Sequence, residues 1–223
     1  MPYLYVVRHG QPDFKGHYDS LTPLGFRQSE WLGEHFAERG LRFARVVSGT
    51  LRRQVETCDT ILAQIPGAPE PRRDARLNEY DHASLLSFFE GDALVRLRVA
   101  GDRRGYFIAM RDALTAWSRY HGALDGSESW ADFGARIEEA GESACEGLGR
   151  NDAVLLVTSG GVIGRMVAAA LGADSDAAIQ LNLQARNTGV SELVRSGAVA
   201  RLAAFNSIPH LEQADRAQAI TYS

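Results

Sequence analysis

Two uninterrupted apolar runs are the strongest features of this 223-residue sequence. Tyr3 to Val7 contains aromatic and β-branched residues, and Ala153 to Val157 contains aliphatic residues only. Neither run alternates with polar positions, which is typical of strands that are buried on both faces of a parallel sheet. We therefore predict that both runs are strands near the centre of such a sheet.

Apolar residues at helical spacing fill much of the chain between these runs. Thr22 followed by Pro23 predicts a helix start, because the hydroxyl can cap free N–H groups and proline has no N–H to lose. The apolar face continues through Trp31 and Leu32 until Gly40 ends the helix. Further helices are predicted, in chain order, over residues 51–64, 85–99, 106–120, from 128 onward, and 162–171.

The order of the elements predicts the fold class. One more strand is expected over 43–47, and strands over 189–195 and 198–205 are expected to form a hairpin at the edge of the sheet. Strands that alternate with helices favour an α/β fold, here a three-layer α/β/α arrangement with a mostly parallel sheet. No linker interrupts the pattern, so we expect one domain over residues 1–223 with a helical insertion at about 83–125.

Composition and charge narrow the class of function. The sequence is 45% hydrophobic and 23% charged, which is ordinary for a globular protein. Its net charge of −4 argues against a nucleic-acid binder, whose electrostatic footprint would be basic. We find no signal-peptide pattern and no apolar run near the ~20 residues that span a membrane. A cytoplasmic protein without nucleic-acid or membrane partners is therefore expected.

The spacing of cysteines and histidines predicts no metal site and no cofactor. Cys58 and Cys145 lie in helix-like patterns without metal or redox spacing, so we interpret both as small buried hydrophobes. Histidines with expected structural or solvated roles are His17, His35, His121 and His210, the last of these in a tail from Asn206 that we expect at the surface.

Candidate chemistry follows directly after the two central strands. Arg8 and His9 end the first run and Ser159 follows the second, and ligands of open α/β sheets bind at the carboxyl ends of strands. Arg53 lies in the first turn of the helix over 51–64, where the helix dipole, free N–H groups and the guanidinium can address one anion, with phosphate the natural candidate. Arg52, the neighbour of Arg53, points about 100° away around this helix, so only one of the two should face the ligand.

Six short blocks occur in the same order as in a known family. They are Arg8-His9-Gly10-Gln11, Leu21-Thr22-Pro23-Leu24-Gly25, Ser48 to Arg53 with Glu56-Thr57, Leu77-Asn78-Glu79, Val157 to Gly161, and Asn206 to His210-Leu211. Together they resemble the blocks of the histidine phosphatase superfamily, the group that includes the cofactor-dependent phosphoglycerate mutases. The resemblance extends over nearly the whole chain, with one departure: the family has His where this chain has Ser159.

The resemblance implies a phosphoglycerate mutase-like fold and a phosphomonoester phosphatase that works through a phosphohistidine on His9. By the family's spacing Arg53, and not Arg52, is the inward member of the pair, and Arg52 is expected in solvent. Arg8 and Arg53 are then the catalytic clamp around the phosphoryl oxygens, and Glu79 is the proton donor for the leaving group. The residues expected to bind the substrate are Gln11, Ser159 and Gly160.

The replacement at position 159 implies a weaker enzyme. Ser159 can donate one neutral hydrogen bond where an imidazolium would donate a charge-assisted one, so a rate loss on the order of 10²-fold is expected. His82 follows Glu79 closely and is one conceivable replacement, if it turns inward.

Two other functions stay open at this point. One is a noncatalytic sensor that binds phosphoryl ligands, and the other is a phosphoglycerate-type mutase. The presence of Arg8, His9, Arg53 and Glu79 favours an enzyme, because a binding protein needs no nucleophile beside an acid. The expected partner is a small phosphorylated substrate. A homodimer is left open, and the natural substrate cannot be inferred from the sequence.

Overall fold

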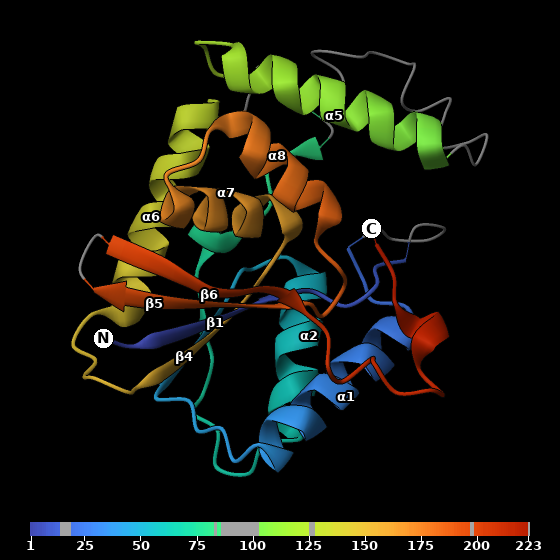
Figure 1. Ribbon diagram of the computed structural model, residues 1–223, viewed down its shortest axis with the longest axis vertical. Coiled ribbons are helices and arrows are strands. Elements are labelled where there is room, and N and C mark those ends of the chain that lie inside the picture. Colours follow the sequence, from blue (N-terminus) through green and yellow to red (C-terminus); the bar gives the residue numbers. More distant parts are fainter. Residues whose placement is uncertain (14–18, 83, 86–102, 125–127, 197–198, 223) are drawn as a thin grey trace.

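The structure is a computed structural model that describes residues 1–13, 19–82, 84–85, 103–124, 128–196 and 199–222. A central sheet carries helices on both of its faces (Figure 1). The helix predicted over 85–99 lies outside the described residues except for Leu85, which is helical. The prediction of one domain with a helical insertion stays a prediction.

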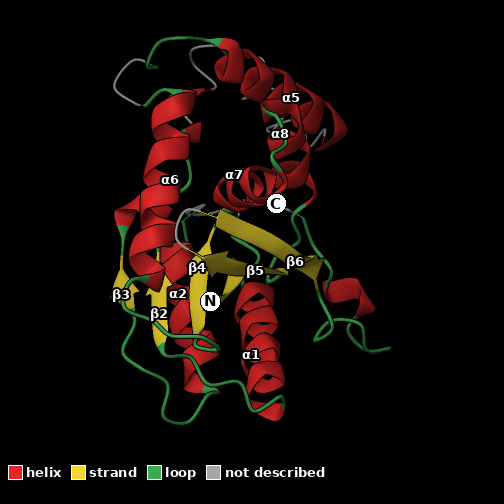
Figure 2. Ribbon diagram, turned by 60° about the vertical axis from the view of Figure 1, so that its left-hand side comes forward, coloured by secondary structure: helices red, strands yellow, loops and turns green. Residues whose placement is uncertain are grey.

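Six strands form the sheet in the described part of the chain, in the order β3-β2-β4-β1-β5-β6. The strands β1 to β4 are mutually parallel, β5 runs antiparallel to β1, and β6 pairs with β5 as a hairpin at the edge (Figure 2). This arrangement confirms the mostly parallel sheet. The bounds are β1 Tyr3–Arg8, β2 Arg45–Ser48, β3 Arg72–Arg73, β4 Ala153–Thr158, β5 Val190–Ser196 and β6 Val199–Ser207.

The two apolar runs are neighbouring central strands, as predicted. In the register of β1 and β4, Tyr3 pairs with Ala153 and Arg8 pairs with Thr158. The residues that follow these strands therefore leave the sheet side by side at its carboxyl edge. His9 and Ser159 thus start from adjacent positions, which places the candidate chemistry at that edge.

The helices cover the two faces of the sheet, which confirms the three layers. Alternate β1 side chains point to opposite faces: Leu4 and Val6 pack in the cluster with α6 and α7, and Tyr5 and Val7 pack in the cluster with α1 and α2. Each such aliphatic side chain, when fully buried, contributes roughly 1.5–3 kcal/mol to folding. The bounds are α1 Pro23–Glu38, α2 Arg52–Ala63, α5 Arg103–Arg119, α6 Trp130–Cys145, α7 Gly160–Leu171 and α8 Ser175–Gln184.

Three features differ from the sequence-based expectations. Helix α8 was not predicted, although Asp174 caps its amino end by accepting a hydrogen bond from the backbone N–H of Ala177 at 2.9 Å. Strand β3 has only two residues, too few to leave a pattern. Helix α7 begins at Gly160, two residues before the predicted start, because the glycine turn after β4 is itself helical.

The prediction of a surface tail from Asn206 is wrong. Ile208 and Leu211 are buried and form a small cluster with Ala219, packed against Trp31 of α1. Ile208 and Leu211 are three residues apart, which fits one helical turn, but two apolar positions beside a proline are too few to predict a buried face. No helix of the described residues is long and apolar enough to cross a membrane.

Candidate active site

His9 lies directly after β1 and is almost completely buried, with 2% of its surface exposed. Its Nε2 faces Arg53, whose Nε–H donates to it at 3.3 Å, and its Nδ1 lies 2.8 Å from the carbonyl oxygen of Gly10. Because Arg53 can only donate, Nε2 must accept, and the ring proton is therefore on Nδ1, where Gly10 O accepts it. This tautomer leaves the lone pair on Nε2, toward Arg53.

The surroundings of His9 keep its imidazole neutral. Its pKa is well below the usual 6.5, first because the ring is buried and then because the charges of Arg53 and Arg8 disfavour a third positive charge. A neutral imidazole with a defined lone pair has the chemical form that a nucleophile needs.

Arg8, the last residue of β1, is buried beside His9. Its Nη1 donates to the backbone carbonyl of Ala185, in the loop between α8 and β5. This contact fixes one edge of the guanidinium against a loop that no sequence pattern singled out.

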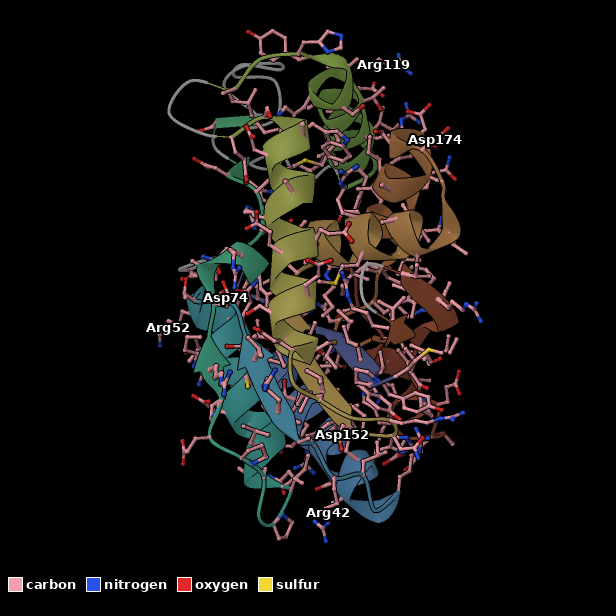
Figure 3. All side chains as sticks on the ribbon, turned by 90° about the vertical axis from the view of Figure 1, so that its left-hand side faces the viewer. Arg42, Arg52, Asp74, Arg119, Asp152 and Asp174 are labelled. Atoms are coloured by element: carbon pink, nitrogen blue, oxygen red, sulfur yellow. The ribbon has the colours of Figure 1, made fainter. Side chains whose placement is uncertain are left out.

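Arg53 is the inward member of the arginine pair, as predicted. Only 5% of its surface is exposed, and its Nη1 donates to the Asp19 carboxylate at 2.8 Å. Arg52 points outward, keeps 65% of its side chain exposed and pairs with Glu56, so its predicted solvation is confirmed (Figure 3). The guanidinium of Arg53 thus joins His9 to Asp19.

The backbone N–H groups at and just before the start of α2 donate to side chains of the protein, so a ligand that binds there must displace them. The N–H of Thr50 donates to Asn78 Oδ1 at 2.7 Å, and the N–H of Arg52 donates to Asp19 Oδ2 at 3.1 Å. The N–H of Leu51 donates to the Gln54 side chain at 3.3 Å. Side chains of the protein itself therefore accept hydrogen bonds from the backbone N–H groups at this helix end.

Glu79 holds the amino end of α7 in a similar way. Its Oε2 accepts from the backbone N–H of Gly161 at 2.9 Å. A Cβ atom at position 161 would lie 2.2 Å from Glu79 Oε1, so the carboxylate reaches this place only because residue 161 is glycine. Burial raises the pKa of Glu79 above its usual value, although Gly161, Arg53 and Arg8 all act to lower it. A raised pKa lets this carboxyl group hold a proton nearer to neutral pH.

Ser159 is fully buried and caps α7 without a hydrogen bond from its side chain to the helix. Its Oγ accepts from Gln54 Nε2 at 2.9 Å, and the same amide nitrogen donates to Leu77 O at 3.1 Å. Gly160 next to it packs closely on Asn182, whose Oδ1 would lie 2.6 Å from an added Cβ. Position 159 is therefore tied to α2 through Gln54.

Gln11 serves the start of α1. Its Oε1 accepts from the Thr22 hydroxyl at 2.9 Å, and its backbone N–H donates to Gln28 Oε1 at 2.9 Å. The structure thus gathers His9, Arg8, Arg53 and Glu79 into one group, because the two arginine charges act on both titratable groups. Ser159 lies next to Gly160, where an added Cβ would be 3.4 Å from Arg8 Cζ, and Gln11 is engaged with the α1 cap.

The sequence analysis assigned no role to Asp19, Gln54, Thr57 or Asn187, which all belong to this network. Gln54 contacts Ser159, and the Thr57 hydroxyl accepts from the Gly10 N–H at 2.9 Å. Asn187 Nδ2 donates to the carbonyl of His9 at 3.0 Å. One sign was available for Asn187: it lies just before β5, and β5 antiparallel to β1 must begin at the carboxyl end of β1.

His82 stacks on Tyr80, with ring centroids 4.6 Å apart and planes at 15°. Its charge contributes slightly to the lowering of the His9 pKa, so the ring lies near the pocket. The structure therefore keeps His82 near the site without showing it bound to His9.

His210 packs and hydrogen-bonds, as predicted. The Thr188 hydroxyl donates to Asn187 O at 2.7 Å, so its oxygen accepts from His210 Nε2 at 2.9 Å. Burial lowers the pKa of His210 to about 3, with smaller contributions from His35 and Arg216. The folded protein therefore keeps His210 neutral where an unfolded histidine is already protonated.

This difference predicts that acid destabilises the fold. Between pH 6.5, the ordinary histidine pKa, and pH 5, His210 alone is expected to reduce the free energy of unfolding by about 1.5 kcal/mol, because the unfolded chain binds the extra proton. His210→Gln, which keeps a side-chain N–H, should remove this part of the pH dependence. Urea unfolding at both pH values, with the exposed His121→Gln as control, measures it. Equal losses in the wild type and His210→Gln would contradict the assignment.

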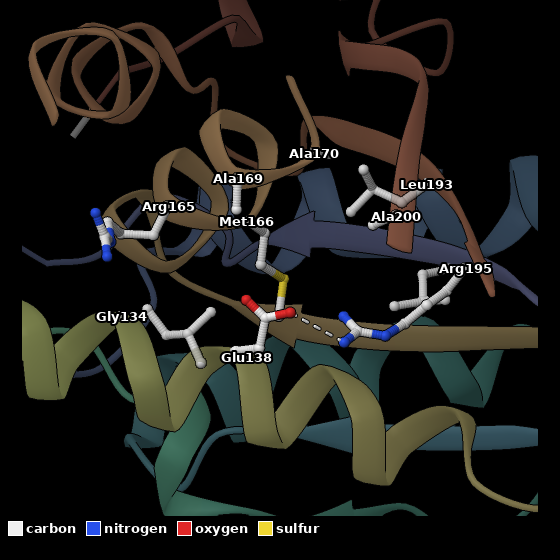
Figure 4. A pocket seen from close by; sticks show the side chains of 11 residues that line it. Gly134, Glu138, Arg165, Met166, Ala169, Ala170, Leu193, Arg195 and Ala200 are labelled. Atoms are coloured by element: carbon white, nitrogen blue, oxygen red, sulfur yellow. Dashed lines mark hydrogen bonds and ion pairs between the residues drawn. The ribbon is translucent and has the colours of Figure 1, made fainter. Parts of the chain in front are cut away.

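Another cavity lies between α6, α7 and the β5–β6 hairpin (Figure 4). Apolar side chains such as Met166 and Leu193 line it together with Arg165, Glu138 and Arg195, and the last two form an ion pair at 3.3 Å. None of the candidate site residues lines this cavity. Within the described ranges, no group of three or more His, Cys, Asp or Glu side chains is placed to hold a metal ion.

Comparison with known sequences identifies one matching family profile, described as histidine phosphatase superfamily (branch 1), over residues 4–90 and 101–208. Serine/threonine-protein phosphatase PGAM5, mitochondrial, of Rattus norvegicus is 37% identical over 68 residues, which cover 29% of this chain and 24% of PGAM5. The 2,3-bisphosphoglycerate-dependent phosphoglycerate mutase of Rhizobium meliloti is 31% identical over 143 residues, which cover 60% of this chain and 62% of the mutase. The chain thus spans about a quarter of PGAM5 and less than two thirds of the mutase.

Solved structures match nearly the whole chain. Mycobacterial glucosyl-3-phosphoglycerate phosphatase in complex with inorganic phosphate is 26% identical, with a TM-score of 0.67, over 95% of this chain and 100% of that chain. A complex of the same phosphatase with VO3 matches with a TM-score of 0.68 at 24% identity, over 93% of this chain and 100% of that chain. The phosphoglycerate mutase-like fold predicted from the sequence is therefore confirmed.

Proposed function

The chain belongs to the histidine phosphatase superfamily, and from this we propose that it is a phosphomonoester phosphatase with His9 as its nucleophile. The observation that carries the proposal is the state of His9, which is neutral, protonated on Nδ1 and directs its Nε2 lone pair toward Arg53. Arg8, Arg53 and Glu79 surround it with the charges that phosphoryl transfer requires.

In the first step, Nε2 of His9 attacks phosphorus in line, and the bond from phosphorus to the ester oxygen breaks. The Nε–H of Arg53 now donates to Nε2, so it must turn to a phosphoryl oxygen before attack. Arg8 and Arg53 then stabilise the charge on the equatorial oxygens. Protonated Glu79 gives its proton to the leaving alkoxide, a role that its raised pKa suits.

In the second step, water attacks the phosphohistidine. Glu79, now a carboxylate, takes a proton from this water, and the bond between phosphorus and Nε2 breaks. Inorganic phosphate leaves, and His9 returns to its neutral form. The Nδ1–H bond to Gly10 O holds the ring orientation through both steps.

We further propose that Ser159 stands in place of a second histidine and donates a neutral hydrogen bond to the phosphoryl group. On this interpretation Ser159→His should raise kcat by on the order of 10²-fold, because an imidazolium donates a charge-assisted hydrogen bond where Ser159 donates a neutral one. Ser159→Ala should lower kcat. The imidazole must displace the Gln54 amide, so thermal unfolding is measured beside turnover. Equal kcat in all three proteins would contradict this role.

The proposed activity is tested by inorganic phosphate release from a panel of small phosphate esters. A phosphoglycerate mutase is the second candidate, because 60% of this chain aligns with a mutase at 31% identity. Supplying 3-phosphoglycerate with a trace of 2,3-bisphosphoglycerate separates the two: a phosphatase releases phosphate, whereas a mutase forms 2-phosphoglycerate. The cytoplasmic location and the homodimer stay predictions.

A further inference from the structure

Asp19 places a carboxylate where an incoming phosphate would be expected. Its Oδ2 accepts from the backbone N–H of Arg52 at 3.1 Å, and its Oδ1 accepts from Arg53 Nη1 at 2.8 Å. The amino end of a helix together with an arginine is a typical anion-binding site. In this protein the Asp19 carboxylate already accepts hydrogen bonds from both.

Arg53 connects this carboxylate to the nucleophile. Its Nη1 binds Asp19 while its Nε donates to His9 Nε2 at 3.3 Å. The guanidinium is planar and rigid. A phosphoryl group on His9 Nε2 must therefore contact the same Arg53 guanidinium that binds Asp19. The Arg53 side chain is 6% exposed and that of Asp19 is 47% exposed, so the pair stands between the buried nucleophile and solvent.

We propose that Asp19 determines how tightly the site holds phosphate, by competing with phosphate for Arg53 and for the amino end of α2. The inference rests on the proposed function, because it concerns ligand affinity at the same pocket. A phosphate dianion bound at His9 meets the like charge of Asp19 at close range and shares its hydrogen-bond donors. Asp19 thereby weakens the binding of both ester and product, and it favours the release of inorganic phosphate.

The competition acts on binding more than on chemistry. The phosphoryl group is anionic in the ester, in the transition state and in the product, so Asp19 disfavours all three to a similar degree. Removing its charge should therefore lower KM and tighten phosphate binding together, without raising kcat. A purely positioning role predicts the opposite sign, because Arg53 would lose its orientation and anions would bind less well.

The test is Asp19→Asn, which keeps an acceptor oxygen for Arg53 and removes the charge. Calorimetric titration with inorganic phosphate is expected to show a Kd about tenfold lower than that of the wild type, with a similar fall in KM for p-nitrophenyl phosphate. The difference should shrink as salt is added, because ions screen the charge. Asp19→Glu, which keeps the charge, should not tighten binding.

Glu30→Gln is the matched control, because Glu30 pairs with Arg27 at 2.8 Å on the surface of α1. It should leave phosphate affinity unchanged. A Kd for phosphate that is unchanged or higher in Asp19→Asn would overturn the proposal. The binding titration needs no turnover, so tighter phosphate binding in a protein without phosphatase activity would refute the proposed function alone. Active protein with unaltered binding would refute the role of Asp19 alone.

Discussion

His9→Ala is expected to lower kcat by roughly 10⁴-fold or more on any phosphate ester, because the covalent route is lost with the imidazole. The effect should fall on kcat and not on ligand affinity, since Arg8 and Arg53 remain to bind the phosphoryl group. Turnover and phosphate binding are measured on the same preparation. His9 is fully enclosed by the fold, so thermal unfolding of the variant is recorded as well.

His35→Ala provides the control for this experiment. His35 is a partly buried histidine of α1 and is not part of the candidate site, so kcat should stay at the wild-type value. A folded His9→Ala protein that retains wild-type turnover would refute the mechanism.

Glu79→Gln is expected to lower kcat by about 10²–10⁴-fold on alkyl phosphates, because glutamine cannot deliver a proton to the leaving oxygen. With p-nitrophenyl phosphate, whose leaving group departs without protonation, the first turnover should stay fast, and only the later hydrolysis of the phosphohistidine should slow. The amide oxygen can still accept from Gly161, so the α7 end is kept. An equal loss of the first-turnover rate for both kinds of ester would contradict the role of Glu79 as the acid.

The dependence of kcat on pH is a second test of Glu79 as the proton donor. The active form needs neutral His9 and protonated Glu79, so kcat on alkyl esters should fall as the pH rises through the raised pKa of Glu79. The rate falls because deprotonated Glu79 can no longer protonate the leaving group. The Glu79→Gln variant should not show this decrease of kcat with rising pH.

The fold was predictable because its central strands are apolar without alternation. The runs ending at Val7 and Val157 are buried on both faces, which is typical of central strands that helices cover on both sides. Where burial depends on partners distant in sequence, the local pattern fails. Ile208 and Leu211 pack on α1 from a turn, and two apolar positions alone do not predict that burial.

The candidate site was predictable as far as strand ends and helix starts determine it. His9 follows the run that forms β1, and this position alone predicts it at the site, whereas the choice of Arg53 over Arg52 and the choice of Glu79 come from the blocks of the family. The supporting contacts of Gln54 and Asn187 arise from tertiary folding, since each is a neutral amide whose partners lie far away in sequence. Asp19 was missed for the same reason, because a loop carboxylate resembles any solvated one until α2 lies beside it.

The central claim is that His9 itself carries the phosphoryl group between the two steps. Rapid denaturing quench during turnover of a phosphate ester, followed by mass spectrometry at neutral to alkaline pH, tests it directly. The account predicts a phosphorylated peptide that contains His9, which appears within the first turnover, accumulates in Glu79→Gln with p-nitrophenyl phosphate and is absent in His9→Ala. Full phosphatase turnover with no phosphate on His9 at any quench time, or with phosphate on another residue, would contradict it.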